Sequence, residues 1–130
     1  MKLNAVEVCT SNMAATLKFY ELLGFEFPQL RGDEQHVDSL VNQGSVRLMI
    51  DKKEVAKEII GSFPIPSNYS SFCIEYDSPE EVNKIVGKVK MLGFMVVKEP
   101  WDAFWGQRYA IIEDPDGYKI DLYAALKSSL

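Results

Sequence analysis

Residues 106–122 read GQRYAIIEDPDGYKIDL, in which two apolar runs flank the sequence Asp-Pro-Asp-Gly at positions 114–117. Aspartate, proline and glycine are favoured in tight turns, whereas β-branched and aromatic residues are favoured in strands. The stretch therefore predicts a β-hairpin, with one strand over 108–113 and the other over 118–123.

A strand and a helix precede this hairpin. Residues 71–76 are typical of a strand, and Ser78, followed by a proline and then by a glutamate three positions on, is typical of a helix N-terminus. Apolar residues recur at helical spacing as far as Gly93, and a further strand is expected over 94–98. The second half of the chain is thus predicted to run strand, helix, strand, strand, strand.

The first half repeats this order. Residues 3–9 are predicted as a strand, with Asn12 as the N-cap and Gly24 as the C-terminal residue of the following helix. Short strands are expected over 25–30, 36–41 and 46–50. Both predicted helices end in Leu-Gly-Phe, and the matched order of elements indicates an internal duplication.

The duplication predicts one domain over residues 1–130, because a chain of this length is too short for two independent cores. Module one is expected over about 1–62 and ends in a short polar helix at 52–61. A linker over about 63–68 leads to module two, over about 69–130.

The composition limits the classes of function. Lys and Arg number 14 against 19 Asp and Glu, which gives a net charge of −5, and the lysines are scattered. This balance argues against binding to a nucleic-acid backbone. The sequence contains no apolar run long enough for a membrane span and no signal-peptide pattern, so a cytoplasmic protein is expected. Cys9 and Cys73 lie in apolar runs and are interpreted as small, buried, reduced side chains.

Two segments carry a family resemblance, LKFYELLGF at 17–25 and the stretch at 106–122. In a duplicated chain they resemble the vicinal oxygen chelate superfamily, which contains glyoxalase I, extradiol dioxygenases, fosfomycin-resistance enzymes and bleomycin-resistance proteins. The resemblance implies an α+β fold of two tandem βαβββ modules, whose curved mixed sheets form a concave cleft. It also implies a homodimer.

Metal-dependent members of the superfamily carry a His or Gln on the first strand and a Glu on the last strand of each module. Carried onto this sequence, these positions are Ala5, Leu48, Ser71 and Asp121, and only Asp121 can bind a divalent cation. No metal or other cofactor is therefore expected. The single histidine, His36, is interpreted as an ordinary strand or turn residue elsewhere in module one.

Two groups of residues are predicted to line the cleft. The inner faces of the first strand of each module carry an acid and a thiol, and residues 101–109 are rich in aromatic side chains. The predicted ligand-binding residues are Glu7, Cys9, Cys73, Glu75, Trp101, Phe104, Trp105, Gln107, Tyr109 and Asp121. The competing interpretation is structural: the acids are held by backbone or Lys partners, and the aromatic residues close the end of the fold or a dimer seam. Arg108 is expected to point outward or to pair with an acid.

The function predicted from these features is sequestration of an aromatic or cationic small molecule, as in the metal-free bleomycin-resistance proteins. No catalytic residue is assigned, and neither nucleic acid nor a membrane is expected as a partner. The alternative is a metal-dependent lyase, isomerase or dioxygenase with an atypical carboxylate site formed by Glu7, Glu75 and Asp121. A third possibility is an interaction module without a ligand.

Overall fold

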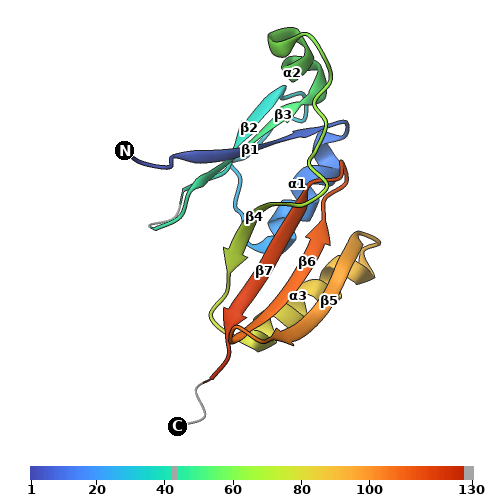
Figure 1. Cartoon of the computed structure of the whole chain (residues 1–130). Helices are drawn as coiled ribbons and strands as arrows, with labels where there is room; N and C mark the ends of the chain where they lie inside the picture. Colours follow the sequence, from blue (N-terminus) through green and yellow to red (C-terminus); the bar gives the residue numbers. More distant parts are fainter. Residues whose placement is uncertain (42–43, 128–130) are drawn as a thin grey trace. The chain divides into compact units, whose positions relative to one another are not determined.

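The computed structural model describes residues 1–41 and 44–127 and divides into two compact units, Met1–Pro66 and Ser67–Leu130. Each unit combines helix and strand (Figure 1), which confirms the predicted α+β class. Among the described residues, no helix has the length and apolar character needed to cross a bilayer.

Unit 1 contains a three-stranded mixed sheet. Its elements are β1 (Ala5–Thr10), α1 (Met13–Leu23), β2 (His36–Asp38), β3 (Arg47–Lys52) and α2 (Lys53–Ile60). The strand order is β1-β3-β2, with β1 parallel to β3 and β2 antiparallel to it. The first and last strands of the unit therefore lie side by side, although α1 and β2 separate them in the sequence.

Helix α1 begins and ends at the predicted residues. The side chain of Asn12 accepts a hydrogen bond from the amide of Ala15 at 3.1 Å, and so satisfies one of the free donors of the first turn. Gly24 ends the helix with a φ of 113°, a left-handed conformation that glycine adopts without steric cost. The helix buries Phe19 and Tyr20, whose rings meet edge to face at 5.0 Å.

The predicted strand over 25–30 is wrong, because these residues have no regular secondary structure. Pro28 lacks the amide hydrogen that a sheet ladder needs. One backbone hydrogen bond does reach the segment, from the amide of Leu40 to the carbonyl of Glu26 at 2.8 Å. The strand expected over 36–41 is also shorter than predicted and ends at Asp38.

Unit 2 contains a four-stranded sheet with one covered face. Its elements are β4 (Ser70–Glu75), α3 (Pro79–Met91), β5 (Met95–Ala103), β6 (Gln107–Glu113) and β7 (Lys119–Ala125), in the strand order β4-β7-β6-β5. β4 and β7 are parallel and the other pairs are antiparallel. Helix α3 lies across β5, β6 and β7 (Figure 1) and buries Val82, Val86 and Val89.

The hairpin between β6 and β7 has the predicted turn. The carboxylate of Asp114 accepts hydrogen bonds from the amides of Asp116 at 2.9 Å and Tyr118 at 3.0 Å. Gly117 takes a φ of 101°, which the tight turn requires. The geometry of the turn therefore accounts for Asp114 and Gly117.

Strand β5 is longer than predicted. The sequence places its end near Lys98, with the aromatic residues after it in a loop, but the strand continues through two register irregularities to Ala103. The loop is therefore a short turn between Ala103 and Gln107, and Trp101 lies on the sheet itself, opposite Tyr109 of β6.

Candidate functional site

The sheet of unit 1 has one apolar and one polar face. In-register partners on adjacent strands place their side chains on the same face, so Val8, Ile50 and Val37 form a row, and all three are buried. The next row along the strands, on the opposite face, consists of Cys9, Asp51 and His36. The polar face also carries Glu7 and Asp38, the register partners of Met49.

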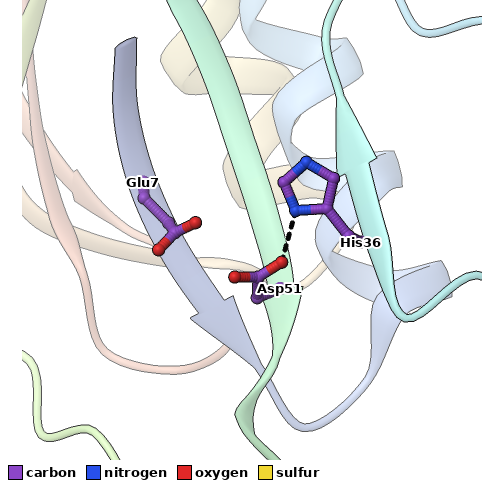
Figure 2. Close-up of side chains that lie close together, drawn as sticks. All are labelled: Glu7, His36 and Asp51. Atoms are coloured by element: carbon purple, nitrogen blue, oxygen red, sulfur yellow. Dashed lines mark hydrogen bonds and ion pairs between the residues drawn. The ribbon is translucent and has the colours of Figure 1, made fainter. Parts of the chain in front are cut away.

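Three side chains of the polar face converge. Figure 2 shows Glu7 on β1, Asp51 on β3 and His36 on β2 with their polar groups turned toward one another. One ligand-type atom from each of the three lies within 4.8 Å of the other two. The Nδ1 atom of His36 is hydrogen-bonded to Asp51, and its Nε2 atom lies 2.9 Å from a carboxylate oxygen of Asp38. We call Glu7, His36 and Asp51 the His–carboxylate cluster.

The pKa values of Glu7 and His36 are raised by their surroundings in this cluster. The pKa of Glu7 is raised, first by partial burial and then by the neighbouring carboxylate of Asp51. Partial burial by itself lowers the pKa of His36, but the hydrogen bonds to Asp51 and Asp38 outweigh it, so that the pKa is raised overall. The cluster therefore favours a positive charge at its centre.

The structure corrects two expectations about module one. His36 does not lie apart from Glu7, because β2 pairs with β3 and brings the imidazole beside the acids. Leu48 cannot serve as a ligand position, since it is fully buried on the apolar face as the register partner of Val6. A shift of one residue along a strand moves a side chain to the other face, and Arg47 is the residue beside Ala5.

The donors at the four superfamily positions do not fit the superfamily's metal. Ala5 has no donor atom, Leu48 is buried and apolar, and Ser71 lies where the register of β4 shifts. Asp121 is the one carboxylate among them, and both of its oxygens already accept hydrogen bonds, from the hydroxyl groups of Ser70 and Tyr109. A single occupied carboxylate cannot replace a set of imidazole and carboxylate ligands.

Unit 2 carries a different polar face, on the side of its sheet away from the buried row of Ala110 and Leu122. One row crosses all four strands and consists of Glu75, Tyr123, Tyr109 and Trp101. The neighbouring row contains Cys73, Asp121, Ile111 and Lys98. Aromatic rings and carboxylates therefore lie together on one surface of the sheet.

Tyr109 lies at the centre of these rings. Its ring centroid is 5.5 Å from that of Trp101 and 5.4 Å from that of Trp105, both edge to face. It is 5.9 Å from Tyr123, with the two planes only 18° apart. The four rings pack in the arrangements that aromatic pairs prefer. We call Trp101, Trp105, Tyr109 and Tyr123 the aromatic face.

Asp121 anchors the aromatic face from within the sheet. The residue is buried, with a relative exposure of 8%, and it accepts hydrogen bonds from the hydroxyl groups of Ser70 and, at 2.5 Å, Tyr109. Burial, and then the hydrogen bond to Asp121, raise the pKa of Tyr109 well above its usual range. The phenol therefore remains a donor at every physiological pH.

The other predicted residues of unit 2 lie on or beside this face. Trp105 donates from Nε1 to the side-chain oxygen of Gln107 at 2.8 Å, and Phe104 is 97% exposed beside it. Cys73 is exposed, against the prediction of a buried thiol, because its place in the register puts it on the open face next to Asp121. Cys9 is buried as predicted.

Sequence reasoning missed two partners in unit 2 and one in unit 1. Tyr123 is two residues beyond Asp121 on the same strand, and alternation alone places it on the same face. The role of Ser70 could not be predicted from the sequence, because the register shift near Ser71 decides which serine is hydrogen-bonded to Asp121. Asp51 was overlooked because it follows the expected strand over 46–50.

Arg108 behaves as predicted. It occupies the opposite face of β6 from Tyr109, pairs with Asp102, and donates to the side chain of Asn83 at 3.0 Å. It therefore belongs to the α3 side of the sheet and does not contribute to the aromatic face.

Comparison with known proteins gives a family match and several structural matches. Residues 2–122 match the family model of the glyoxalase/bleomycin resistance protein/dioxygenase superfamily. No curated protein sequence gives a significant match. A hypothetical protein from S. aureus is similar in structure, with a TM-score of 0.77, 20% identity, and coverage of 95% of this chain and 93% of that one.

Two further solved structures are enzymes or related to enzymes. A glyoxalase-related enzyme from Fulvimarina pelagi has a TM-score of 0.79 at 14% identity, covering 95% of this chain and 87% of that one. A lactoylglutathione lyase from Agrobacterium tumefaciens has a TM-score of 0.67 at 19% identity, covering 95% and 92%. At these identities the likeness concerns the fold alone.

Proposed function

Since this chain belongs to the glyoxalase/bleomycin resistance protein/dioxygenase superfamily, we propose that it binds a planar, positively charged small molecule on the aromatic face of unit 2. The ligand is held and released without chemical conversion, as in the bleomycin-resistance branch. The observation that carries this proposal is the row Glu75, Tyr123, Tyr109 and Trp101, which sets three aromatic rings beside one another and ends in a carboxylate.

The rings offer a surface for stacking. Trp105 is 49% exposed and Phe104 more so, although large aromatic groups are usually covered in a monomer. Lys98 lies over the ring of Trp101 at 4.5 Å and so covers part of one edge of the aromatic face. A planar ligand is therefore expected to contact Trp105 and the Tyr109–Tyr123 pair.

The charges set the orientation of the ligand. Glu75 is exposed at the β4 end of the row, whereas Lys98 lies at the β5 edge. A cationic group of the ligand is therefore expected near Glu75, and the planar group near Trp105.

Sequestration is favoured over conversion by the donor chemistry of the superfamily positions. The competing carboxylate site requires Asp121 as a metal ligand, but its oxygens are engaged by Ser70 and Tyr109. A metal ion would have to displace both hydroxyl groups from a buried carboxylate.

We also propose that two chains pair as a homodimer, on the precedent of the family. Light scattering after size-exclusion chromatography tests this proposal, and a monomer in solution would contradict it.

A titration with proflavine, a planar cation, tests the ligand proposal, with anthracene-9-carboxylate as the planar anion for comparison. Quenching of the two tryptophans reports binding. We expect proflavine to bind more tightly than the anion, and Trp105→Ala to raise its Kd about tenfold, or about 1.4 kcal/mol. Glu75→Gln is expected to reduce the preference for the cation.

Phe63→Ala is the matched control, because Phe63 is an exposed aromatic residue of unit 1. It should leave proflavine binding unchanged. If neither compound binds at millimolar concentration, or if Phe63→Ala and Trp105→Ala have equal effects, the aromatic face is not a ligand site and the interaction-module hypothesis is favoured.

A further inference from the structure

We propose that the His–carboxylate cluster of unit 1 is a binding site for one divalent transition-metal ion. The site consists of Glu7, His36 and Asp51, none of which is a metal-ligand position of the superfamily pattern. This proposal is independent of ligand binding on the aromatic face, and it departs from the expectation that the protein takes no metal.

The donors come from three adjacent strands. β1, β3 and β2 are hydrogen-bonded to one another, so the backbone holds the three side chains on one face without any loop in between. Sites built on strands keep their geometry better than sites built on loops. The cluster is therefore in place in the folded unit before any ion arrives.

The spacing suits a single ion. The ligand atoms of the three side chains lie within 4.8 Å of one another. Two donors that each lie about 2.1 Å from one ion are at most about 4.2 Å apart. Side-chain rotations that move each donor by less than about 1 Å bring all three into the coordination range of Zn²⁺.

The chemistry of the donors selects the class of ion. One imidazole with two carboxylates suits Mn²⁺, Fe²⁺, Co²⁺, Ni²⁺ or Zn²⁺, whereas Ca²⁺ and Mg²⁺ favour oxygen donors throughout. Asp51 is largely buried, while Glu7 and His36 are exposed on the solvent side. The ion would keep open positions for water, since three protein ligands do not fill its coordination sphere.

Asp38 supplies the orientation that a metal-binding imidazole needs. Its carboxylate oxygen lies 2.9 Å from Nε2 of His36, while Nδ1 faces Asp51. Histidine ligands commonly donate their second N–H to a carboxylate, which fixes the ring and the free nitrogen. Arg47 lies 3.7 Å from the other oxygen of Asp38 and helps to hold it. Asp38 is therefore a positioning residue, outside the ligand set.

The charges of the cluster also favour binding of a divalent cation. Glu7, Asp38 and Asp51 gather three carboxylates around one imidazole, and Glu7 and Asp51 face each other. Arg47 lies beside Asp38, so a protonated His36 balances at most one of the two charges of Glu7 and Asp51. A divalent ion at Nδ1 would take the place of the proton in the hydrogen bond between His36 and Asp51 and would balance two charges. It would also replace the repulsion between Glu7 and Asp51 by coordination of both.

Titration of the chelator-treated full chain with Co²⁺ tests the site. Calorimetry should give one Co²⁺ per chain, displaced by Zn²⁺ and unaffected by excess Mg²⁺. The visible spectrum should report nitrogen and oxygen ligands, without the near-ultraviolet charge-transfer band of a thiolate. Such a band would identify Cys9 or Cys73 as a ligand and would overturn the proposed donor set.

Variants locate the ion. Glu7→Gln and His36→Gln should each weaken Co²⁺ binding by more than about tenfold, and Asp38→Asn by about 10-fold to 100-fold, because the imidazole loses the carboxylate that orients it. Glu75→Gln is the matched control, because it removes an exposed acid from the first strand of unit 2, and it should leave Co²⁺ binding unchanged. Circular dichroism confirms that each variant is folded.

The proposed metal site and the proposed ligand site can be tested independently of each other. Glu7→Gln and His36→Gln should leave proflavine binding intact, and Trp105→Ala should leave Co²⁺ binding intact. The metal site is excluded if the wild-type chain binds no Co²⁺ at millimolar concentration, or if stoichiometric binding survives both Glu7→Gln and His36→Gln. An Asp38→Asn variant with wild-type affinity overturns the positioning role of Asp38.

Discussion

The sheets of the two units share their backbone plan but differ in their polar faces. In each, the first strand pairs in parallel with the last, and the central positions of the apolar face are fully buried. On the opposite face, unit 1 gathers an imidazole and carboxylates, whereas unit 2 gathers aromatic rings. Packing restrains the buried face, while the open face is free to acquire different chemistry.

The largest effects are expected on the shared, buried face. Leu48 of β3 and Leu122 of β7 both lie on the strand that pairs with the first strand of their unit, and both are fully buried. We expect Leu48→Ala and Leu122→Ala each to lower the free energy of unfolding by about 2–5 kcal/mol. Urea denaturation measures both. A loss of less than about 1 kcal/mol in only one variant would show that the two apolar faces are not equivalent.

A smaller effect is expected at the centre of the aromatic face. Asp121→Asn removes an acceptor for the hydroxyl groups of Ser70 and Tyr109, and should cost about 1–3 kcal/mol. Its counterpart Asp51→Asn should cost less, because the partner His36 is exposed to water. An equal loss in the two variants would contradict the stronger dependence of unit 2 on its buried acid.

The Asp121→Asn substitution should also change the titration of a tyrosine. Burial, and then Asp121, raise the pKa of Tyr109 above the ordinary value of 10. The folded state thus favours the neutral phenol, so this contribution to stability is present below pH 10 and falls as the pH rises through the higher folded-state value. Asp121→Asn should lower the pKa of one tyrosine in an absorbance titration. Tyr109→Phe is the control, and should remove that transition altogether.

Removal of the helix caps should have matched effects of about 1 kcal/mol in the two units. Asn12 caps α1 through the amide of Ala15 at 3.1 Å, and Ser78 caps α3 through the amide of Glu81 at 3.2 Å. Asn12→Ala and Ser78→Ala should therefore lower the melting temperature by similar amounts. A loss confined to one variant would show that the other helix is held by packing, with little contribution from its cap.

The smallest changes in stability are expected at two glycines, where alanine should have opposite effects. Gly24 ends α1 at a φ of 113°, so Gly24→Ala should destabilise the chain by about 1 kcal/mol. Gly87 lies within α3, where a methyl group on its Cα would meet open space, and its φ is not positive. Gly87→Ala should stabilise the chain by about 0.5–1 kcal/mol. Thermal denaturation of both variants checks the opposite signs.

The sequence predicted the elements that local rules determine. The caps at Asn12 and Ser78 and the turn at 114–117 follow from side-chain hydrogen bonds and backbone conformation within a few residues. The α+β class followed from the repeated order of these elements. The strand expected over 25–30 failed because strand formation depends on a partner, which no local pattern supplies.

The candidate sites depended on register, which the sequence does not reveal. Alternation placed Glu7 and Cys9 on one face of β1, but the pairing of β3 with β2 decides that His36 lies beside them. Likewise, the irregular register of β5 places Trp101 opposite Tyr109. These contacts join residues on different strands, so neither composition nor periodicity could identify them.

The missing strand of unit 1 has a practical consequence for work with this protein. The connection after α1 contains a surface turn in which the carboxylate of Glu34 accepts hydrogen bonds from the amides of Arg31 and Gly32, at 2.8 and 2.9 Å. No sheet ladder passes through this turn among the described residues, so extra chain there would disturb neither register nor core. It is therefore a place to insert an epitope or a fluorescent reporter without interrupting a strand of unit 1.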